Sequence, residues 1–167
     1  MNENTGTTEL SLRDHDGHHV TISALSAPYS VMPAQLDHLL IPSKDQVAAA
    51  KLIAHLLGIR WAERGTAGPF SAVYVNASLT LDFDQWSGAV PKQHYAFRVE
   101  SAEFDAILAR IKASGLPYRS TPMGPDDYKV NCAYGGKLVY WSEPDGHAWE
   151  ILTVSYARES PPIVAVG

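Results

Sequence analysis

Cysteine and charge are both scarce in this chain of 167 residues. The single cysteine, Cys132, excludes an internal disulfide, fits a reducing compartment such as the cytoplasm, and is expected to be a small buried side chain. Only 19% of the residues are charged, and the net charge of −5 offers no basic surface to nucleic acid. No apolar run reaches the length of a membrane span, and the polar N-terminus lacks the pattern of a signal peptide. We therefore expect a cytoplasmic globular protein that binds neither nucleic acid nor membrane.

The first 34 residues differ from the rest of the chain. After a polar start, residues 10–25 alternate between apolar and polar side chains on both sides of Asp16-Gly17, which predicts a β-hairpin. Three histidines flank this turn: His15, His18 and His19. We interpret them as solvated side chains rather than metal ligands. Residues 1–34 are thus expected to be an extension outside the main fold, and residues 159–167 a C-terminal tail.

The remainder carries an internal repeat. Residues 35–86 have the pattern of a strand, a helix and three further strands, and the same order returns in residues 91–154. His38 and His94 occupy the first strand of each copy, with an offset of 94 − 38 = 56 residues. Neither copy is long enough to bury its own sheet well, so we expect one domain over residues 35–158. The predicted fold is α+β, with two four-stranded modules that form a cup-shaped mixed sheet around a central cavity.

Each copy contains one helix with recognisable boundaries. The first, residues 43–58, has Ser43 as its expected capping residue and ends at Gly58. The second, residues 100–115, ends at Gly115. The predicted core positions on the two helices are Val47, Ala50, Ile53, Ala54 and Leu57, and then Phe104, Ile107, Leu108 and Ile111. Because these apolar residues recur at helical spacing, both helices are expected to pack on one side of the sheet.

Two histidines and one glutamate form a candidate metal site. Alternation along the strands places His38 and His94 on the concave side of the sheet, away from the helices. Glu150 lies in the apolar last strand, where an unpaired carboxylate would be costly to bury. Two imidazoles and a carboxylate suit a divalent cation such as Fe, Zn, Mn, Ni or Co, and they leave positions open for substrate. We predict that these three residues bind one ion, either within one chain or across a dimer.

The segment Tyr140-Trp-Ser-Glu-Pro-Asp-Gly-His-Ala-Trp-Glu150 resembles the vicinal oxygen chelate superfamily, in which a tyrosine, a Pro-Asp-Gly turn and a ligand glutamate follow one another. The runs LDHLLI and HYAFRV are similar to its two strands with ligand histidines, and the resemblance covers roughly residues 36–153. The superfamily includes glyoxalase I, fosfomycin-resistance enzymes, methylmalonyl-CoA epimerase, extradiol dioxygenases and bleomycin-resistance proteins. Membership implies paired βαβββ modules around a metal cup, a small substrate that chelates the metal through adjacent oxygens, and frequently a homodimer.

The resemblance also implies two catalytic candidates. Asp82 is the counterpart of Glu150 in the repeat, and glyoxalase-like and epimerase-like members have a fourth ligand or a base in that strand. Tyr140 stands where extradiol and fosfomycin-type members have a tyrosine that contacts substrate or a metal-bound oxygen, and its phenol would donate a hydrogen bond to an oxyanion. The alternatives are a solvated edge carboxylate for Asp82 and a packed core tyrosine for Tyr140.

Two further residues are candidates for substrate binding. Arg98 shares a strand face with His94, so it either fixes an anionic group of the substrate or forms a salt bridge at the rim. Asn131 lies in the segment where extradiol members carry a histidine a few residues before the tyrosine, and we assign it to substrate contact. The lack of that histidine argues against ring cleavage.

The leading hypothesis is a divalent-metal-dependent enzyme that acts on a small oxygen-rich substrate by Lewis-acid activation of metal-chelated oxygens. Its reaction would be that of a glyoxalase-like or epimerase-like lyase or isomerase, or of a dioxygenase. The alternative is a non-catalytic protein that sequesters a drug or metabolite in the same cup, as bleomycin-resistance relatives do. Such relatives typically lack the ligand triad. A third hypothesis is that the histidines only fill the core.

Overall fold

The structure, a computed structural model, describes residues 8–13, 19–24 and 35–156. The chain divides into two compact units, Met1–Gln35 and Leu36–Gly167. In the first unit, β1 (Thr8–Arg13) pairs antiparallel with β2 (His19–Ala24). The expected turn at Asp16-Gly17, the side chains of the three neighbouring histidines, and the expected tail of residues 159–167 lie outside what is described.

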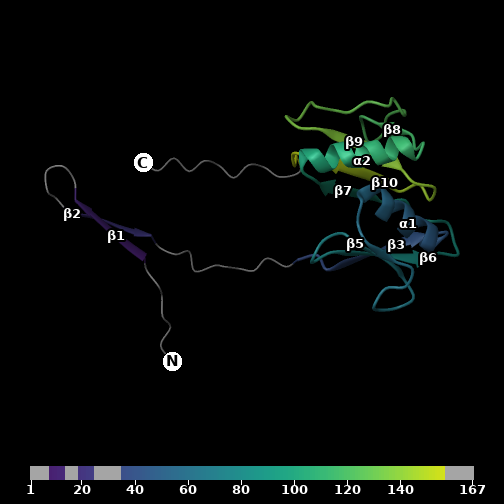
Figure 1. Cartoon of the computed structure of the whole chain (residues 1–167), viewed down its shortest axis with the longest axis horizontal. Helices are drawn as coiled ribbons and strands as arrows, with labels where there is room; N and C mark the ends of the chain where they lie inside the picture. The colour runs from purple at the N-terminus through teal and green to yellow at the C-terminus, as the bar shows by residue number, and fades with distance from the viewer. Residues whose placement is uncertain (1–7, 14–18, 25–34, 157–167) are drawn as a thin grey trace. The chain divides into compact units, whose positions relative to one another are not determined.

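The second unit contains two modules with the same order of elements (Figure 1). The first module consists of β3 (His38–Ser43), α1 (Gln46–Leu57), β4 (Trp61–Ala62), β5 (Ser71–Tyr74) and β6 (Thr80–Gln85). The second module consists of β7 (His94–Arg98), α2 (Ser101–Ala113), β8 (Tyr118–Arg119), β9 (Leu138–Ser142) and β10 (Ala148–Leu152). This arrangement confirms the predicted α+β fold of two βαβββ modules.

The two sheets have matching topology. Their strand orders are β3-β6-β5-β4 and β7-β10-β9-β8, and in each sheet the first strand of the module pairs parallel with the last. The register repeats as well, since Leu40 lies opposite Asp82 and Ala96 lies opposite Glu150. His38 and His94 each lie two residues before those positions. Equivalent strand positions therefore carry the candidate site residues in both modules.

Helix α1 begins later than the sequence predicted. Its N-cap is Asp45, whose side chain accepts a hydrogen bond of 3.0 Å from the backbone N–H of Ala48. The predicted cap, Ser43, is instead the last residue of β3, because its backbone still pairs with Gln85, and its buried hydroxyl donates to Asp145 at 2.6 Å. Gly58 ends the helix as predicted, with the left-handed φ of 72°.

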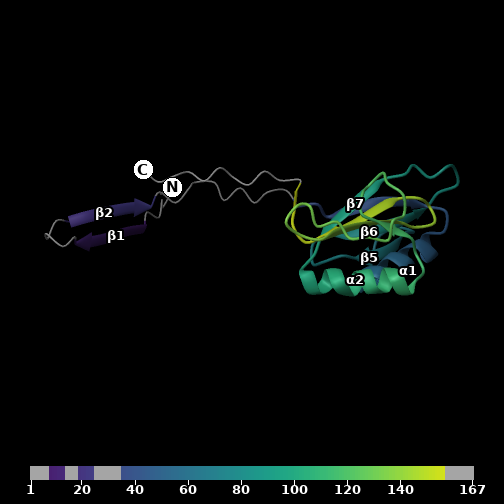
Figure 2. The same cartoon turned by 90° about the horizontal axis from the view of Figure 1, so that it is seen from above.

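One apolar core joins the helices to the inner faces of both sheets. Figures 1 and 2 show α1 lying against the first sheet and α2 lying across the second. The four predicted core residues of α2 are buried, as are those of α1 except for the half-buried Val47. At the centre, the ring of Trp149 lies 4.7–6.5 Å from the rings of Tyr95, Phe97, Trp141 and Phe83. Because Phe83 belongs to the first module and the other rings to the second, the core is continuous across both.

A buried histidine ties the two modules together. Nε2 of His147 lies 2.9 Å from the carbonyl oxygen of Pro42 in the first module, and its Nδ1 lies 3.1 Å from the backbone nitrogen of Gln93. Since the carbonyl only accepts and the N–H only donates, the proton of this imidazole is on Nε2. Arg110 makes a second link, because its Nε donates to the carbonyl of Leu56 at 2.7 Å. These contacts fix how the modules pack.

Within the described segments, neither helix combines the length and the apolar character needed to cross a membrane. Cys132 is exposed, so the expectation of a buried side chain was wrong. The cysteine lies just after the isolated bridge between Asn131 and Leu138, where the chain turns at the edge of the second sheet and its side chain stays outside the core.

Candidate metal centre

The second module brings His94 and Glu150 together. They lie on the neighbouring parallel strands β7 and β10, and Nε2 of His94 is 3.1 Å from Oε2 of Glu150. The Glu150 side chain is fully buried, whereas the His94 side chain is 46% exposed. A buried carboxylate needs a partner. Here the partner is the imidazole of His94, which also faces solvent. His94 is therefore not a core-filling residue.

Two tyrosine hydroxyls complete the surroundings of Glu150. The hydroxyl of Tyr156 donates to Oε1 at 2.8 Å, and the hydroxyl of Tyr140 lies 3.1 Å from that of Tyr156. Because Tyr156 uses its proton on the carboxylate oxygen of Glu150, the hydroxyl of Tyr140 donates to that of Tyr156. Burial raises the pKa of both phenols above the usual tyrosine range, so both remain protonated donors near neutral pH.

Tyr156 was missed by sequence reasoning. It follows β10 in a segment without a strand or helix period, so no alternation marks its direction. The only signal was its position six residues after Glu150, which does not fix where the side chain points.

The first module brings His38 and Asp82 together. Both lie on the outer face of their sheet and line a cavity of about 330 Å³, together with Asp37, Tyr74 and Thr80. The hydrogen bond from His38 Nδ1 to Asp37, at 2.9 Å, raises the pKa of the imidazole. Burial raises the pKa of Asp82, while the nearby His38 opposes that shift. With 59% of its side chain exposed, His38 is also not a core-filling residue.

A small residue keeps this cavity open. Ala72 lies opposite Asp82 in the register, at the position that Tyr140 takes opposite Glu150. The repeat is thus asymmetric. In the first module, His38 and Asp82 line a cavity. In the second module, the hydroxyls of Tyr140 and Tyr156 lie next to His94 and Glu150.

The three predicted ligands do not meet within one chain. Among the residues that the structure describes, no group of three or more His, Cys, Asp or Glu side chains is arranged to hold a metal ion. The inner faces of the two sheets share one core, so each pair lies on an outer face of its own module.

The atoms at hand nevertheless fit part of a coordination sphere. Two ligand atoms at right angles around an ion, with bonds of about 2.1 Å, are about 3 Å apart. The separation of 3.1 Å between His94 Nε2 and Glu150 Oε2 is of that size. One imidazole nitrogen and one carboxylate oxygen are also the donor types that first-row divalent metals accept. The pair therefore fits as two adjacent ligands of one ion.

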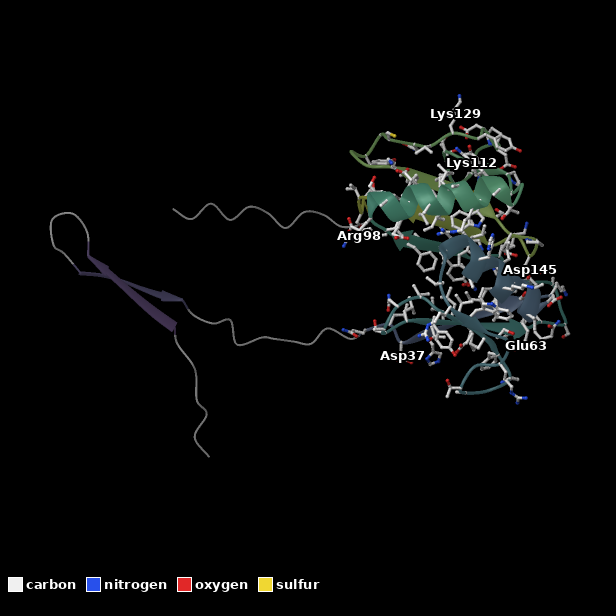
Figure 3. All side chains as sticks on the ribbon, in the orientation of Figure 1. Asp37, Glu63, Arg98, Lys112, Lys129 and Asp145 are labelled. Carbon is white, nitrogen blue, oxygen red and sulfur yellow. The ribbon has the colours of Figure 1, made fainter. Side chains whose placement is uncertain are left out.

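The two predicted substrate contacts lie elsewhere. Arg98 ends β7 at the opposite end of the second module from Asp145 (Figure 3), and it lines a separate cavity of about 270 Å³ with Phe97 and Val99. The amide of Asn131 is engaged by the protein itself. Its Nδ2 donates to the carbonyl of Ser120 at 3.1 Å, and its Oδ1 accepts from the N–H of Ala133 at 2.8 Å.

No protein-family model matches the chain, and no curated protein matches it. Among solved structures, one described as oxidase ChaP-H1 is 41% identical with a TM-score of 0.69, and the match covers 75% of this chain and 99% of the oxidase. Oxidase ChaP-H2 is 35% identical with a TM-score of 0.71, and the match covers 77% of this chain and 100% of the oxidase.

A more distant structure shares the fold. The fosfomycin resistance protein FosX from Mesorhizobium loti is 18% identical with a TM-score of 0.55, and the match covers 74% of this chain and 94% of FosX. At this identity the likeness shows the fold alone, whereas the two oxidases are far more similar in sequence over nearly their whole length. The chain belongs to the vicinal oxygen chelate superfamily, as its segment from Tyr140 to Glu150 predicted.

Proposed function

We propose that the protein is a divalent-metal-dependent enzyme whose ion is held by His94 and Glu150 of one chain and by His38 of a second copy. The observation that carries this proposal is the 3.1 Å approach of an exposed imidazole to a fully buried carboxylate. A divalent cation beside Glu150 would offset the cost of burying its carboxylate. Fe, Zn, Mn, Ni and Co all suit two imidazoles and a carboxylate.

The faces that carry the two half-sites support assembly with a second copy. Leu36 and Leu40 flank His38 and are 56% and 53% exposed, and Val154 and Tyr156 near Glu150 are 44% and 43% exposed. Apolar side chains gathered around polar ligands are typical of a surface that is covered in the assembled protein. In a two-fold homodimer, the first module of each copy would meet the second module of the other, which gives two complete sites.

Each candidate site residue then has a chemical role. His94 and Glu150, with His38 of the second copy, would hold the divalent ion, which would supply Lewis-acid chemistry to the oxygens of a bound substrate. Asp82, whose pKa burial raises, is placed beside His38 as a fourth ligand or as a base that accepts a proton from the substrate. Tyr156 donates a hydrogen bond to the buried Glu150, and Tyr140 donates one to Tyr156. The 330 Å³ cavity beside His38 is of the size that holds a small molecule.

The comparisons support one reaction class among the alternatives. The identity of 41% and 35% to two proteins described as oxidases favours an oxidation over lyase or isomerase chemistry. We therefore place the protein on the oxidative side of the alternatives, with a redox-active ion such as Fe or Mn. The sequestering alternative predicts tight binding of a small molecule that a chelator does not disturb. A cytoplasmic location stays a prediction from the single cysteine.

A mixed dimer tests the proposal. His38→Ala and Glu150→Ala chains with different tags are refolded or exchanged together, and the mixed dimer is isolated by both tags. If the site forms between copies, one site of the mixed dimer keeps all three ligands and the other loses two. The mixed dimer should then bind about half the metal of the wild type, by elemental analysis, while both parent variants bind little.

The opposite arrangement gives a different count. If each site forms within one chain, every site of the mixed dimer lacks one ligand, and its metal content stays at that of the parents. A wild-type protein that is monomeric, or that binds no stoichiometric divalent metal, would contradict the proposal at the first step.

A further inference from the structure

Tyr156 contacts both carboxylate oxygens of Glu150, whereas His94 contacts one of them. Oε2 lies 3.1 Å from Nε2 of His94, on the side of the second ligand. The hydroxyl of Tyr156 lies within hydrogen-bond distance of both oxygens, 2.8 Å from Oε1 and 3.0 Å from Oε2. A carboxylate in contact with His94 alone would be free to turn about its last bond, and a donor fixed beside both oxygens restricts that rotation.

Tyr156 is itself held in place from two sides. Its ring stacks on Tyr134, from the loop between β8 and β9, with centroids 5.1 Å apart and planes inclined by 28°. Its hydroxyl oxygen lies 3.1 Å from the hydroxyl of Tyr140, which donates to it. Since Tyr140 is buried in the sheet and Tyr134 belongs to a different loop, the position of the Tyr156 hydroxyl is set by the fold rather than by one flexible segment.

We propose that Tyr156 is a positioning residue for the metal ligand Glu150, a role that rests on the proposed function. By holding the carboxylate through both oxygens, it keeps Oε2 beside Nε2 of His94, at the separation of two neighbouring ligand atoms around one ion. Tyr140 assists by holding Tyr156. Partners of this kind orient a ligand and reduce its freedom before the metal arrives.

An opposite role for the same contact makes the opposite prediction. A phenol that occupied the place of the ion would have to leave when metal binds, and its removal would strengthen binding. A positioning phenol stays, and its removal weakens binding because Glu150 then has to be ordered by the metal itself. The sign of the change in metal affinity separates the two.

The experiment compares Tyr156→Phe with Tyr134→Phe, and its probe is Co²⁺ alone. Both variants lose one hydroxyl and keep both stacked rings, but only Tyr156 donates to Glu150. We expect Tyr156→Phe to bind Co²⁺ about 10-fold more weakly in competition with a chromophoric chelator, and to change the visible absorption of the bound ion. Tyr134→Phe should match the wild type in both. A third variant, Tyr140→Phe, should weaken binding less, since it acts only through Tyr156.

Each other outcome overturns the proposal in a recognisable way. Wild-type affinity and an unchanged spectrum in Tyr156→Phe would mean that Tyr156 only packs, even if the melting temperature of its metal-free form fell. Tighter binding would mean that the phenol competes with the ion. In both cases the wild type still binds Co²⁺ and the proposed metal site stands. A wild type that does not bind Co²⁺ would remove the proposed function and this inference together.

Discussion

Oε2 of Glu150, a side chain with no exposed surface, lies 3.1 Å from Nε2 of His94 on the neighbouring strand. Glu150→Gln keeps the shape of the side chain but removes its charge. We expect it to lower metal affinity by more than the roughly 10–100-fold that the loss of an outer hydrogen-bond partner costs. The free energy of unfolding of the metal-free protein should change little, because an amide can keep these hydrogen bonds without the cost of a buried charge.

Equilibrium dialysis and urea unfolding of the same preparations measure the two effects. A variant that loses stability but keeps full metal affinity would make Glu150 a structural residue instead of a ligand.

The link between the modules gives a second prediction. His147→Ala leaves the buried carbonyl of Pro42 and the partly buried N–H of Gln93 without their partner, and each loss costs free energy. We expect the free energy of unfolding to fall by roughly 2–4 kcal/mol. His55→Ala, at an exposed position of α1, is the control and should change it by less than about 0.5 kcal/mol. Equal stability of the two variants would refute a joining role for His147.

Two helix-ending glycines make a matched pair. Gly58 and Gly115 have φ values of 72° and 68°, a conformation that costs other residues about 1–2 kcal/mol. A Cβ at Gly58 would lie 2.8 Å from the guanidinium of Arg110, whereas a Cβ at Gly115 would meet nothing within 4 Å. Gly115→Ala should therefore show the backbone cost alone. Gly58→Ala should be less stable still, because Arg110 has to shift away from the carbonyl of Leu56. Chemical denaturation of both variants gives the difference, and no difference would show that Arg110 yields without cost.

A buried tyrosine predicts how stability depends on alkaline pH. Burial raises the pKa of Tyr95 from the usual value of 10.0 to about 12. The unfolded chain therefore releases this proton first, and the contribution of Tyr95 is fully present below pH 10 and lost as the pH rises toward 12. The loss amounts to about 2–3 kcal/mol. The stability of Tyr95→Phe, measured by denaturant titration at several pH values, should fall less over this interval, and parallel curves for both proteins would disprove the assignment.

The fold could be predicted from the sequence because the same pattern of strands and helix occurs twice. Two copies of one pattern, each with an apolar helix face, predicted the two modules, and period-two alternation predicted that His38 and His94 avoid the helix side of their sheets. The counterpart relation of Asp82 and Glu150 is also seen in the register of β6 and β10. These properties depend on local periods, which a single sequence records.

Other features depended on contacts that no local period records. Ser43 has a side chain that can cap a helix. It instead pairs within a strand and donates a hydrogen bond to Asp145, more than 100 residues away. Tyr156 reaches Glu150 from an irregular segment. Alternation also gives the face of a strand without giving which other module that face will meet. For this reason the sequence predicted candidate ligands but left open whether their site forms within one chain or across a dimer.

The most direct measurement is a crystal structure of the metal-loaded protein, with anomalous diffraction recorded at the absorption edge of the bound ion. We predict one anomalous peak per site, within bonding distance of His94 and Glu150 of one copy and of His38 of another. A peak bound by all three residues of a single chain, a peak away from Glu150, or no peak in fully loaded crystals would contradict it.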